Sequence, residues 1–359
     1  MVFEAVPNFS AGRDGALVAA LGEGPDVIDV HADADHNRAV VTLVDASAGR
    51  LADSAFRRVA LAVARIDLAG HGGVHPRVGA ADVVPLVPLA GAPMAAAVAE
   101  ARRLGERVWR ELGVPVFFYG EAAGGRRLAD IRAGRVAPDL GAAPHPTAGA
   151  VCVGARGPLV AYNVAFAGLP LTAGRRVAAA MRELPGVQAL AFALPGGRTQ
   201  VSMNLTRPDE TGAPAAYARA CALAGAPGEP ELVGLCPAAA AGPGCDGGLL
   251  EARLAALAAR RAAAEAAARG GEEPARLAGR LAAEARSLGA LEAGQDAILG
   301  GAERAAALAR VLRAGRLASP ELEALLAAAA SGLRTAVAPA TAARFERRVA
   351  LLDRWLRSA

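Results

Sequence analysis

The five histidines are the residues of this sequence best suited to acid–base chemistry near neutral pH, and all lie within the first 145 residues. Four of them fall in two short segments, DVHADADHNR at 29–38 and HGGVHPRVGAADVVP at 71–85. An imidazole with an unperturbed pKa near ~6.5 can both accept and donate a proton. The clustering therefore predicts a polar site in the N-terminal part of the chain.

His75 is the strongest candidate for an acid/base residue. Glycines at 72, 73 and 79 and Pro76 predict a tight loop that leads into a strand beginning near Asp82, and loops at strand ends often present reactive side chains. Arg77, two residues further on, carries a planar guanidinium that can bind a carboxylate through two N–H groups. From these residues alone, His75 is either catalytic or a structural loop histidine.

A metal site is the alternative for the earlier segment. His31, Asp33 and Asp35 alternate, so an extended chain would place them on one face, where imidazole and carboxylates could bind a cation. The other interpretation is a polar loop in which aspartates cap backbone groups. We favour the loop and expect no metal, because no further ligand is evident. No HExxH, GxSxG or phosphate-loop motif occurs, and the four cysteines lack CxxC spacing, which predicts free and mostly buried thiols.

Composition narrows the class of protein. Hydrophobic residues make up 53% of the 359 residues, the net charge is +4, and all 39 basic residues are arginine. No basic stripe with interleaved aromatics is present, so we expect no nucleic-acid partner. No apolar run approaches ~18 residues and the N-terminus lacks a signal core, so we expect no membrane span and a cytoplasmic protein.

Hydrophobic periodicity predicts an α+β fold in three parts: 1–145, 146–248 and a helical appendage of unknown role at 249–359. In the first part, strands are expected at 3–7, 26–32, 38–44, 82–89 and 114–120, with helices at 47–66 and 93–113. In the second, strands at 159–166, 187–195, 199–206 and 231–237 alternate with helices at 171–184 and 212–225. That order is typical of a ferredoxin-like α/β sandwich, with 195–197 as a hairpin loop.

The first part follows a similar, longer order, so we expect two ferredoxin-like α/β subdomains. In the appendage, Gly270-Gly271 and Gly300-Gly301 are expected to separate helices. Ser319 and Pro320 predict a helix start, with serine as the cap and proline at the first helical position.

A series of motifs in fixed order resembles glutamate formimidoyltransferase, also found as the N-terminal half of formimidoyltransferase–cyclodeaminase. The matching pieces are VPNFS (6–10), DVHADADHNRAVVTLV (29–44), HPRVGAADVVPLVP (75–88), LGVPVFFYGEAA (112–123), LADIRAG (128–134), PDLG (138–141), HPTAGAVCVGAR (145–156), LVAYNV (159–164), QVSMNL (200–205) and ELVGLCP (231–237). They are spread over about 240 residues. The appendage lacks the Pro-Gly-Gly-Gly signature of a cyclodeaminase, so we expect no such activity.

The resemblance implies a folate cleft between the two subdomains, His75 as the general acid/base, and tetrahydrofolate as co-substrate without a metal. It also implies a folate-contacting segment: Gly141, Ala142, Ala143, Pro144, His145, Pro146, Thr147, Ala148, Gly149 and Ala150. Arg38 and Arg77 are expected to bind substrate carboxylates, and Asp35 to orient a histidine or bind the formimidoyl nitrogen. Asn8, Asn163 and Asn204 are candidate hydrogen-bond donors, with a structural role as the alternative.

The implied reaction moves a formimidoyl group from N-formimidoyl-L-glutamate to N5 of tetrahydrofolate. Two alternatives stay open. In the first, the enzyme transfers a formyl group or uses an amino-acid donor other than glutamate. In the second, the chain is a non-catalytic folate-binding scaffold. We expect a homodimer, with small molecules as the other partners.

Overall fold

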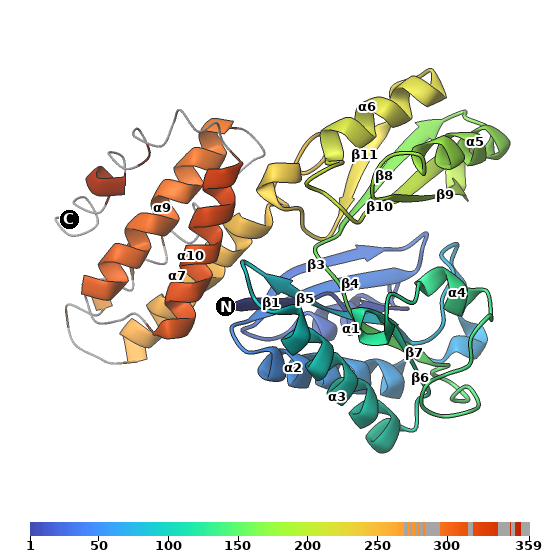
Figure 1. The fold of residues 1–359 in the computed structure, drawn as a ribbon, viewed down its shortest axis with the longest axis horizontal. Helices are drawn as coiled ribbons and strands as arrows, with labels where there is room; N and C mark the ends of the chain where they lie inside the picture. The colour runs from blue at the N-terminus through green and yellow to red at the C-terminus, as the bar shows by residue number, and fades with distance from the viewer. Residues whose placement is uncertain are drawn as a thin grey trace. The chain divides into compact units, whose positions relative to one another are not determined.

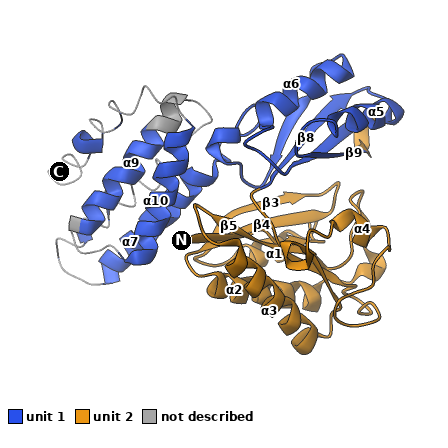
Figure 2. Cartoon of the chain, viewed as in Figure 1, with its two compact units in different colours: residues 1, 159–191, 199–359 blue, residues 2–158, 192–198 orange. Residues whose placement is uncertain are grey.

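The computed structural model describes residues 1–268, 295–314 and 319–336, together with isolated positions at 272, 275–276, 279–280, 283, 345 and 349–352. It contains two β-sheets and a group of helices in the C-terminal part (Figure 1). Contacts divide the chain into two units (Figure 2). The unit of residues 2–158 and 192–198, orange in Figure 2, is here called the first unit. The unit of residues 1, 159–191 and 199–359, blue in Figure 2, is here called the second unit.

The sheet of the first unit is built around a strand interrupted by Pro7. The two pieces, β1 (Val2–Ala5) and β2 (Asn8–Phe9), both lie between β4 (Arg38–Asp45) and β5 (Ala81–Leu89), antiparallel to each. Proline has no amide hydrogen, so it cannot continue the ladder as a donor. Its carbonyl still accepts a hydrogen bond from Val41 N at 3.0 Å. β3 (Val27–Asp33) extends this sheet beyond β4.

Two amphipathic helices cover the core side of this sheet. They are α2 (Ala48–Arg65), which packs on β1, β4 and β5, and α3 (Met94–Leu112), which packs on β5, β6 and β7. The short helix α1 (Gly15–Leu21) contacts α2. Ser47 caps α2 by accepting a hydrogen bond from Arg50 N, and Gly113 ends α3 in the left-handed conformation (φ 64°). The predicted strands and helices of this part are confirmed.

Strand β7 lies beyond the predicted boundary at residue 145 and belongs to the first sheet. β7 (Val151–Ala155) pairs in parallel with β5 and with β6 (Val116–Gly120). The helix α4 (Leu128–Arg132) lies in the connection between β6 and β7. The first unit accordingly runs to Pro158, while the division into three domains stays a prediction.

The sheet of the second unit has the order β11-β8-β10-β9. Its strands are β8 (Val160–Ala167), β9 (Val187–Leu194), β10 (Arg198–Leu205) and β11 (Glu229–Val233). The helices α5 (Leu171–Met181) and α6 (Ala213–Ala224) follow β8 and β10 and contact each other. This order is consistent with the predicted ferredoxin-like arrangement, and residues 195–197 do connect two neighbouring strands.

The described part of the C-terminal region is helical as predicted, except at one point. It contains α7 (Leu250–Ala268), α9 (Gln295–Ala314) and α10 (Pro320–Thr335), and α10 packs against both others. The predicted break at Gly300-Gly301 is wrong, because α9 continues through both glycines. Each glycine costs a helix about 1 kcal/mol, which packing on α10 outweighs. Ser319 does cap α10, whereas Gly270-Gly271 lie outside the described residues.

Candidate active site

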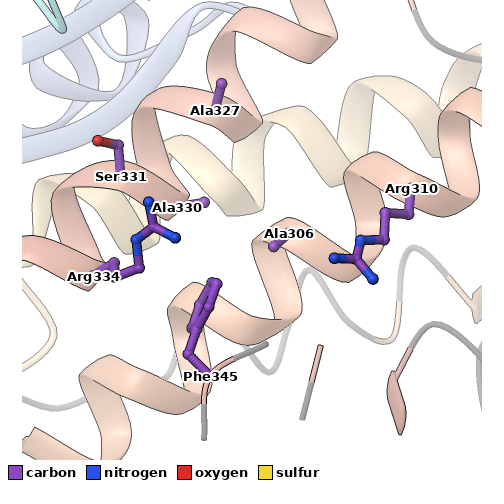
Figure 3. A pocket seen from close by; sticks show the side chains of 7 residues that line it. All are labelled: Ala306, Arg310, Ala327, Ala330, Ser331, Arg334 and Phe345. Atoms are coloured by element: carbon purple, nitrogen blue, oxygen red, sulfur yellow. The ribbon is translucent and has the colours of Figure 1, made fainter. Parts of the chain in front are cut away.

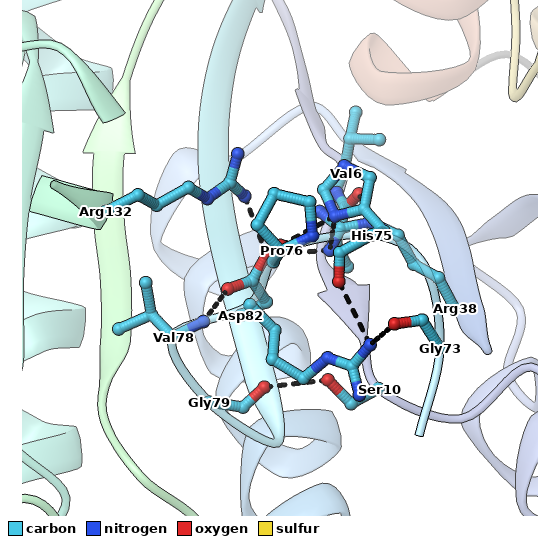
Figure 4. A network of polar contacts seen from close by, with 12 residues as sticks. Val6, Ser10, Arg38, Gly73, His75, Pro76, Val78, Gly79, Asp82 and Arg132 are labelled. Carbon is cyan, nitrogen blue, oxygen red and sulfur yellow. Dashed lines mark hydrogen bonds and ion pairs between the residues drawn. The ribbon is translucent and has the colours of Figure 1, made fainter. Parts of the chain in front are cut away.

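A buried carboxylate on β5 organises the polar site of the first unit. Asp82 is fully buried, and its Oδ2 accepts hydrogen bonds from Arg38 at 2.7 Å and Arg132 at 2.8 Å (Figure 4). Its Oδ1 accepts one from the backbone N–H of Val78 at 2.6 Å. Burial alone would raise the pKa of Asp82, but the two guanidinium charges outweigh burial and lower it. One negative charge therefore faces two positive ones.

The His75 ring lies beside this charge cluster. Its Nδ1 is 2.7 Å from the carbonyl oxygen of Pro76 and 3.4 Å from a terminal nitrogen of Arg38. The carbonyl can only accept, so the short contact assigns the proton to Nδ1 and leaves the lone pair on Nε2. The centre of the His36 ring lies 5.9 Å from that of the imidazole. The Phe192 ring, near the end of β9 and in the segment 192–198 that belongs to the first unit, lies 6.1 Å away.

The surroundings strongly favour neutral His75. Burial is the largest cause, and the charges of Arg38 and Arg132 add to it, together lowering the pKa of His75 to about 3. Asp82 opposes this effect without cancelling it. At neutral pH the imidazole is therefore a proton acceptor, with its lone pair available at Nε2.

Arg77 holds the loop that carries His75. Its guanidinium donates to the carbonyls of Gly73 and His75, both at 3.0 Å, and to Nδ1 of His71. His71 in turn donates from Nε2 to the carbonyl of Ser10 at 2.9 Å. These contacts give Arg77 a structural role in the loop, and binding of a substrate carboxylate by Arg77 stays a prediction.

The segment predicted to contact folate lies directly against the same loop. Ala80 N donates to the carbonyl of Ala148 at 2.9 Å, and Ala150 N donates to the carbonyl of Val78 at 3.1 Å. His145 and Gly149 close a turn through two backbone hydrogen bonds of 2.7 and 3.0 Å. In the same segment, Ala142, Ala143, Pro144 and Pro146 are exposed.

Two other predicted residues of the first unit also lie here. Asn8 donates to the carbonyl of Val6 at 2.7 Å and accepts from Nε of Arg38 at 3.0 Å, so it fixes the guanidinium that contacts Asp82. Asp35 contributes its backbone carbonyl, which accepts from Val74 N in the loop at 3.2 Å. Asn8, Asp35, Arg38, His75 and Arg77 thus all lie in the first unit, and their roles in binding and catalysis stay predictions.

Asn163 and Asn204 belong to the second unit. Asn163 is buried and donates to the carboxylate of Glu231 at 2.9 Å, and Gln200 donates to the same oxygen at 3.2 Å. Asn204, on β10, is exposed. Their roles in substrate binding stay predictions.

Two further kinds of chemistry, metal binding and nucleophilic attack by Cys152, can be compared with the described residues. No group of three or more histidine, cysteine or acidic side chains there is arranged to hold a metal ion. The four cysteines are free, and three are buried, as expected. Burial raises the pKa of Cys152, on β7, to about 12, so its thiol is not a nucleophile at neutral pH. None of the described helices is long and apolar enough to span a bilayer.

Sequence reasoning missed two residues at the centre of this site, Asp82 and Arg132. Asp82 interrupts the otherwise apolar strand ADVVPLVPL, and a lone acid in a buried strand needs a cationic partner. That signal was available from the sequence. Arg132 stands in LADIRAG, 50 residues further along the chain, and only the fold brings it to Asp82.

A separate cavity of about 210 Å³ lies among the C-terminal helices (Figure 3). It is lined by Ala306, Arg310, Ala327, Ala330, Ser331, Arg334 and Phe345. The guanidinium of Arg334 lies 5.2 Å from the centre of the Phe345 ring, which is a cation–π distance. This lining offers no imidazole or carboxylate, so it lacks the acid–base groups of the His75 site.

A neutral imidazole beside two guanidiniums on an α/β scaffold provides the groups that an enzyme acting on anionic substrates by acid–base chemistry needs. Comparison with known proteins gives the particular family. The formiminotransferase domain, N-terminal subdomain, matches residues 2–156. The glutamate formimidoyltransferase of Thermoplasma acidophilum is 38% identical over 266 residues, covering 65% of this chain and 88% of that protein. The chain therefore belongs to the glutamate formimidoyltransferase family.

Other relatives agree. The glutamate formimidoyltransferase of Streptococcus pyogenes is 38% identical over 185 residues, covering 45% of this chain and 62% of that protein. The formimidoyltransferase-cyclodeaminase of Gallus gallus is 36% identical over 271 residues, covering 65% of this chain and 50% of that protein. The chain thus spans about half the length of that bifunctional relative.

Proposed function

We propose that this chain transfers the formimidoyl group of N-formimidoyl-L-glutamate to N5 of tetrahydrofolate, with His75 as general base and then general acid. The observation that carries the proposal is the neutral imidazole of His75, fixed through Nδ1 and bordered by guanidiniums, in a chain 38% identical to a glutamate formimidoyltransferase. Both substrates carry carboxylates, which a positively charged site attracts.

The reaction needs one proton to move between two nitrogens. N5 of tetrahydrofolate attacks the formimidoyl carbon, forming an N–C bond and a tetrahedral intermediate. Nε2 of His75 removes the proton from N5 and delivers it to the glutamate nitrogen as the old C–N bond breaks. Atoms and charge balance without a covalent enzyme intermediate. Such a proton transfer contributes about 10²–10⁴-fold in rate.

The folate is proposed to lie along 141–150, next to the His75 loop. The supporting contacts are the hydrogen bonds that join Ala148 and Ala150 to Val78 and Ala80. This arrangement would bring N5 toward the imidazole while the exposed part of the turn contacts the pterin or its p-aminobenzoyl group. No metal takes part in the proposed reaction, so turnover should be unchanged after treatment with a chelator.

The decisive measurement is tetrahydrofolate-dependent release of glutamate by the purified chain and by His75→Ala. Turnover reduced at least ~100-fold in a folded variant would support the proton-transfer role. Near-full activity in the variant would move that role to another residue. If the unmutated chain binds folate but releases no glutamate, a formyl donor, another amino-acid donor or a binding function replaces the proposed one.

The proposal extends to a cytoplasmic homodimer. Light scattering on the full chain measures the oligomeric state directly, and a monomer at micromolar concentration would contradict it.

A further inference from the structure

The charge cluster around Asp82 contains more positive than negative charge. Arg38 and Arg132 both donate to the same oxygen, Oδ2, at 2.7 and 2.8 Å, and the other oxygen is occupied by Val78 N. The side chains of Asp82, Arg38 and Arg132 are 0, 14 and 23% exposed. Charges buried to this degree are costly unless they are balanced, so the cluster as it stands is one anion short.

Arg132 is the member with unused hydrogen-bonding capacity. Its Nε is buried and forms no hydrogen bond within the described part of the chain. Nearly all buried donors have partners, and one without them points to a group supplied from elsewhere. Arg38 differs, because its Nε donates to Asn8 and its terminal nitrogen to Asp82.

We propose that Arg132 binds a carboxylate of the amino-acid donor and thereby sets both the donor specificity and the proton affinity of the His75 site. This inference rests on the function proposed above. The carboxylate brings the missing negative charge, and the guanidinium fork fits its two oxygens.

The chemistry of the two substrates identifies which one Arg132 binds. In formimidoylglutamate, the α-carboxylate is attached to the carbon that bears the reacting nitrogen. In tetrahydrofolate, the carboxylates are separated from N5 by the p-aminobenzoyl group. A guanidinium in the same cluster as His75 therefore suits the donor carboxylate, which must lie close to the reacting atoms.

Binding of the anion also activates the base. Arg38 and Arg132 disfavour a proton on His75, Asp82 favours it, and His36 and Phe192 are the remaining ring neighbours. A carboxylate bound to Arg132 offsets the positive charge, so the imidazole accepts a proton more readily when the donor is present. A general base works best when its pKa lies near the working pH. The site then becomes a competent base only with the donor bound.

The test compares Arg132→Gln and Arg132→Lys with the matched control Arg135→Gln, all in the full chain. Arg135 is an exposed arginine, 2.8 Å from Asp130. Arg132→Gln should raise the donor KM about 10- to 100-fold, the effect of one charge-assisted pair, while the tetrahydrofolate KM stays within about twofold. In Arg132→Lys the donor KM should rise less than in Arg132→Gln, because lysine keeps the positive charge but cannot bind both carboxylate oxygens as a guanidinium does. The control should match the unmutated chain.

A second readout does not depend on turnover. Titration of the His75 imidazole by NMR, with and without saturating L-glutamate, should show a rise in its pKa on binding in the unmutated chain and no rise in Arg132→Gln. Unchanged donor KM and an unchanged glutamate-induced shift in Arg132→Gln would overturn the inference while leaving the transferase function intact. Equal increases in both KM values would also overturn it, since they indicate general loss of structure. Failure of the unmutated chain to turn over would instead reject the function.

Discussion

Each of the two sheets carries an acidic side chain that accepts hydrogen bonds from side chains of other strands, but the donors differ in charge. In the first, Asp82 on β5 accepts from Arg38 on β4, and Asn8 stands on the strand between them. In the second, Glu231 on β11 accepts from Asn163 on the adjacent β8 and from Gln200 on β10. The side-chain donors named for Asp82 are charged guanidiniums, and the two named for Glu231 are neutral amides.

That difference is the one expected between a reactive site and a structural cluster. Guanidiniums impose a field on the neighbouring imidazole and leave positive charge for an anion, whereas amides satisfy a carboxylate without creating an excess. We infer that chemistry resides in the first sheet because its polar cluster is charged and incompletely balanced. The following predictions test this contrast.

The largest effect is expected from removing the acid of each cluster. Asp82→Asn leaves Arg38 and Arg132 facing each other without a counter-charge, which should cost about 3–5 kcal/mol of unfolding free energy. Glu231→Gln keeps a carbonyl oxygen that can accept from the amides of Asn163 and Gln200, so the loss at these two hydrogen bonds should be about 1 kcal/mol. Urea unfolding of both variants at pH 7 measures the difference. Equal losses would mean that the two clusters are energetically alike.

A second contrast concerns two glycines of the His75 loop. A methyl group on Gly79 would collide with the carbonyl of Ala150, whereas one on Gly72 meets nothing within 4 Å. Gly79→Ala should therefore push the loop away from the 141–150 segment, cost about 1–3 kcal/mol and weaken tetrahydrofolate binding. Gly72→Ala is the matched control and should bind folate normally. If both variants bind equally, the contact between loop and segment is not needed for folate.

Much of this arrangement follows from the sequence, and the exceptions have physical causes. Alternating and helical periodicity located the longer strands and helices within a few residues, because those patterns directly reflect which faces are buried. The short elements α1, α4 and β7 were not predicted, because five to seven residues give too little periodicity to distinguish them. The helix break predicted at Gly300-Gly301 was wrong because the low helix propensity of glycine is a weaker effect than packing against a neighbouring helix. Arg132 was missed because ion pairing between residues 50 apart leaves no trace in local spacing.

The pH dependence of the unfolding free energy should reveal how strongly its surroundings disfavour a proton on His75. The folded state holds the pKa of His75 near about 3, below the unfolded value of ~6.5. Between those limits the unfolded chain binds more protons, so stability falls as the pH is lowered from ~6.5 toward 3. In His75→Gln this contribution is absent, and the loss of stability between pH 6.5 and 4.5 should be shallower, by at most about 1.4 kcal/mol per pH unit. Identical slopes would show that neither burial nor the charges of Arg38 and Arg132 lowers the pKa of His75 in the folded chain.

The smallest expected effect comes from the cluster of Glu231, Asn163 and Gln200 in the second sheet. Gln200→Met removes one amide donor to Glu231 at 3.2 Å but keeps a side chain of similar volume, and the bond from Asn163 remains. The cost should be about 0.5–1.5 kcal/mol, the usual value for one neutral donor, with kcat unchanged. Thermal unfolding and the glutamate-release assay measure the two quantities. A fall in kcat without a matching loss of stability would place the second cluster in the reaction, and the division into one reactive and one structural sheet would then be wrong.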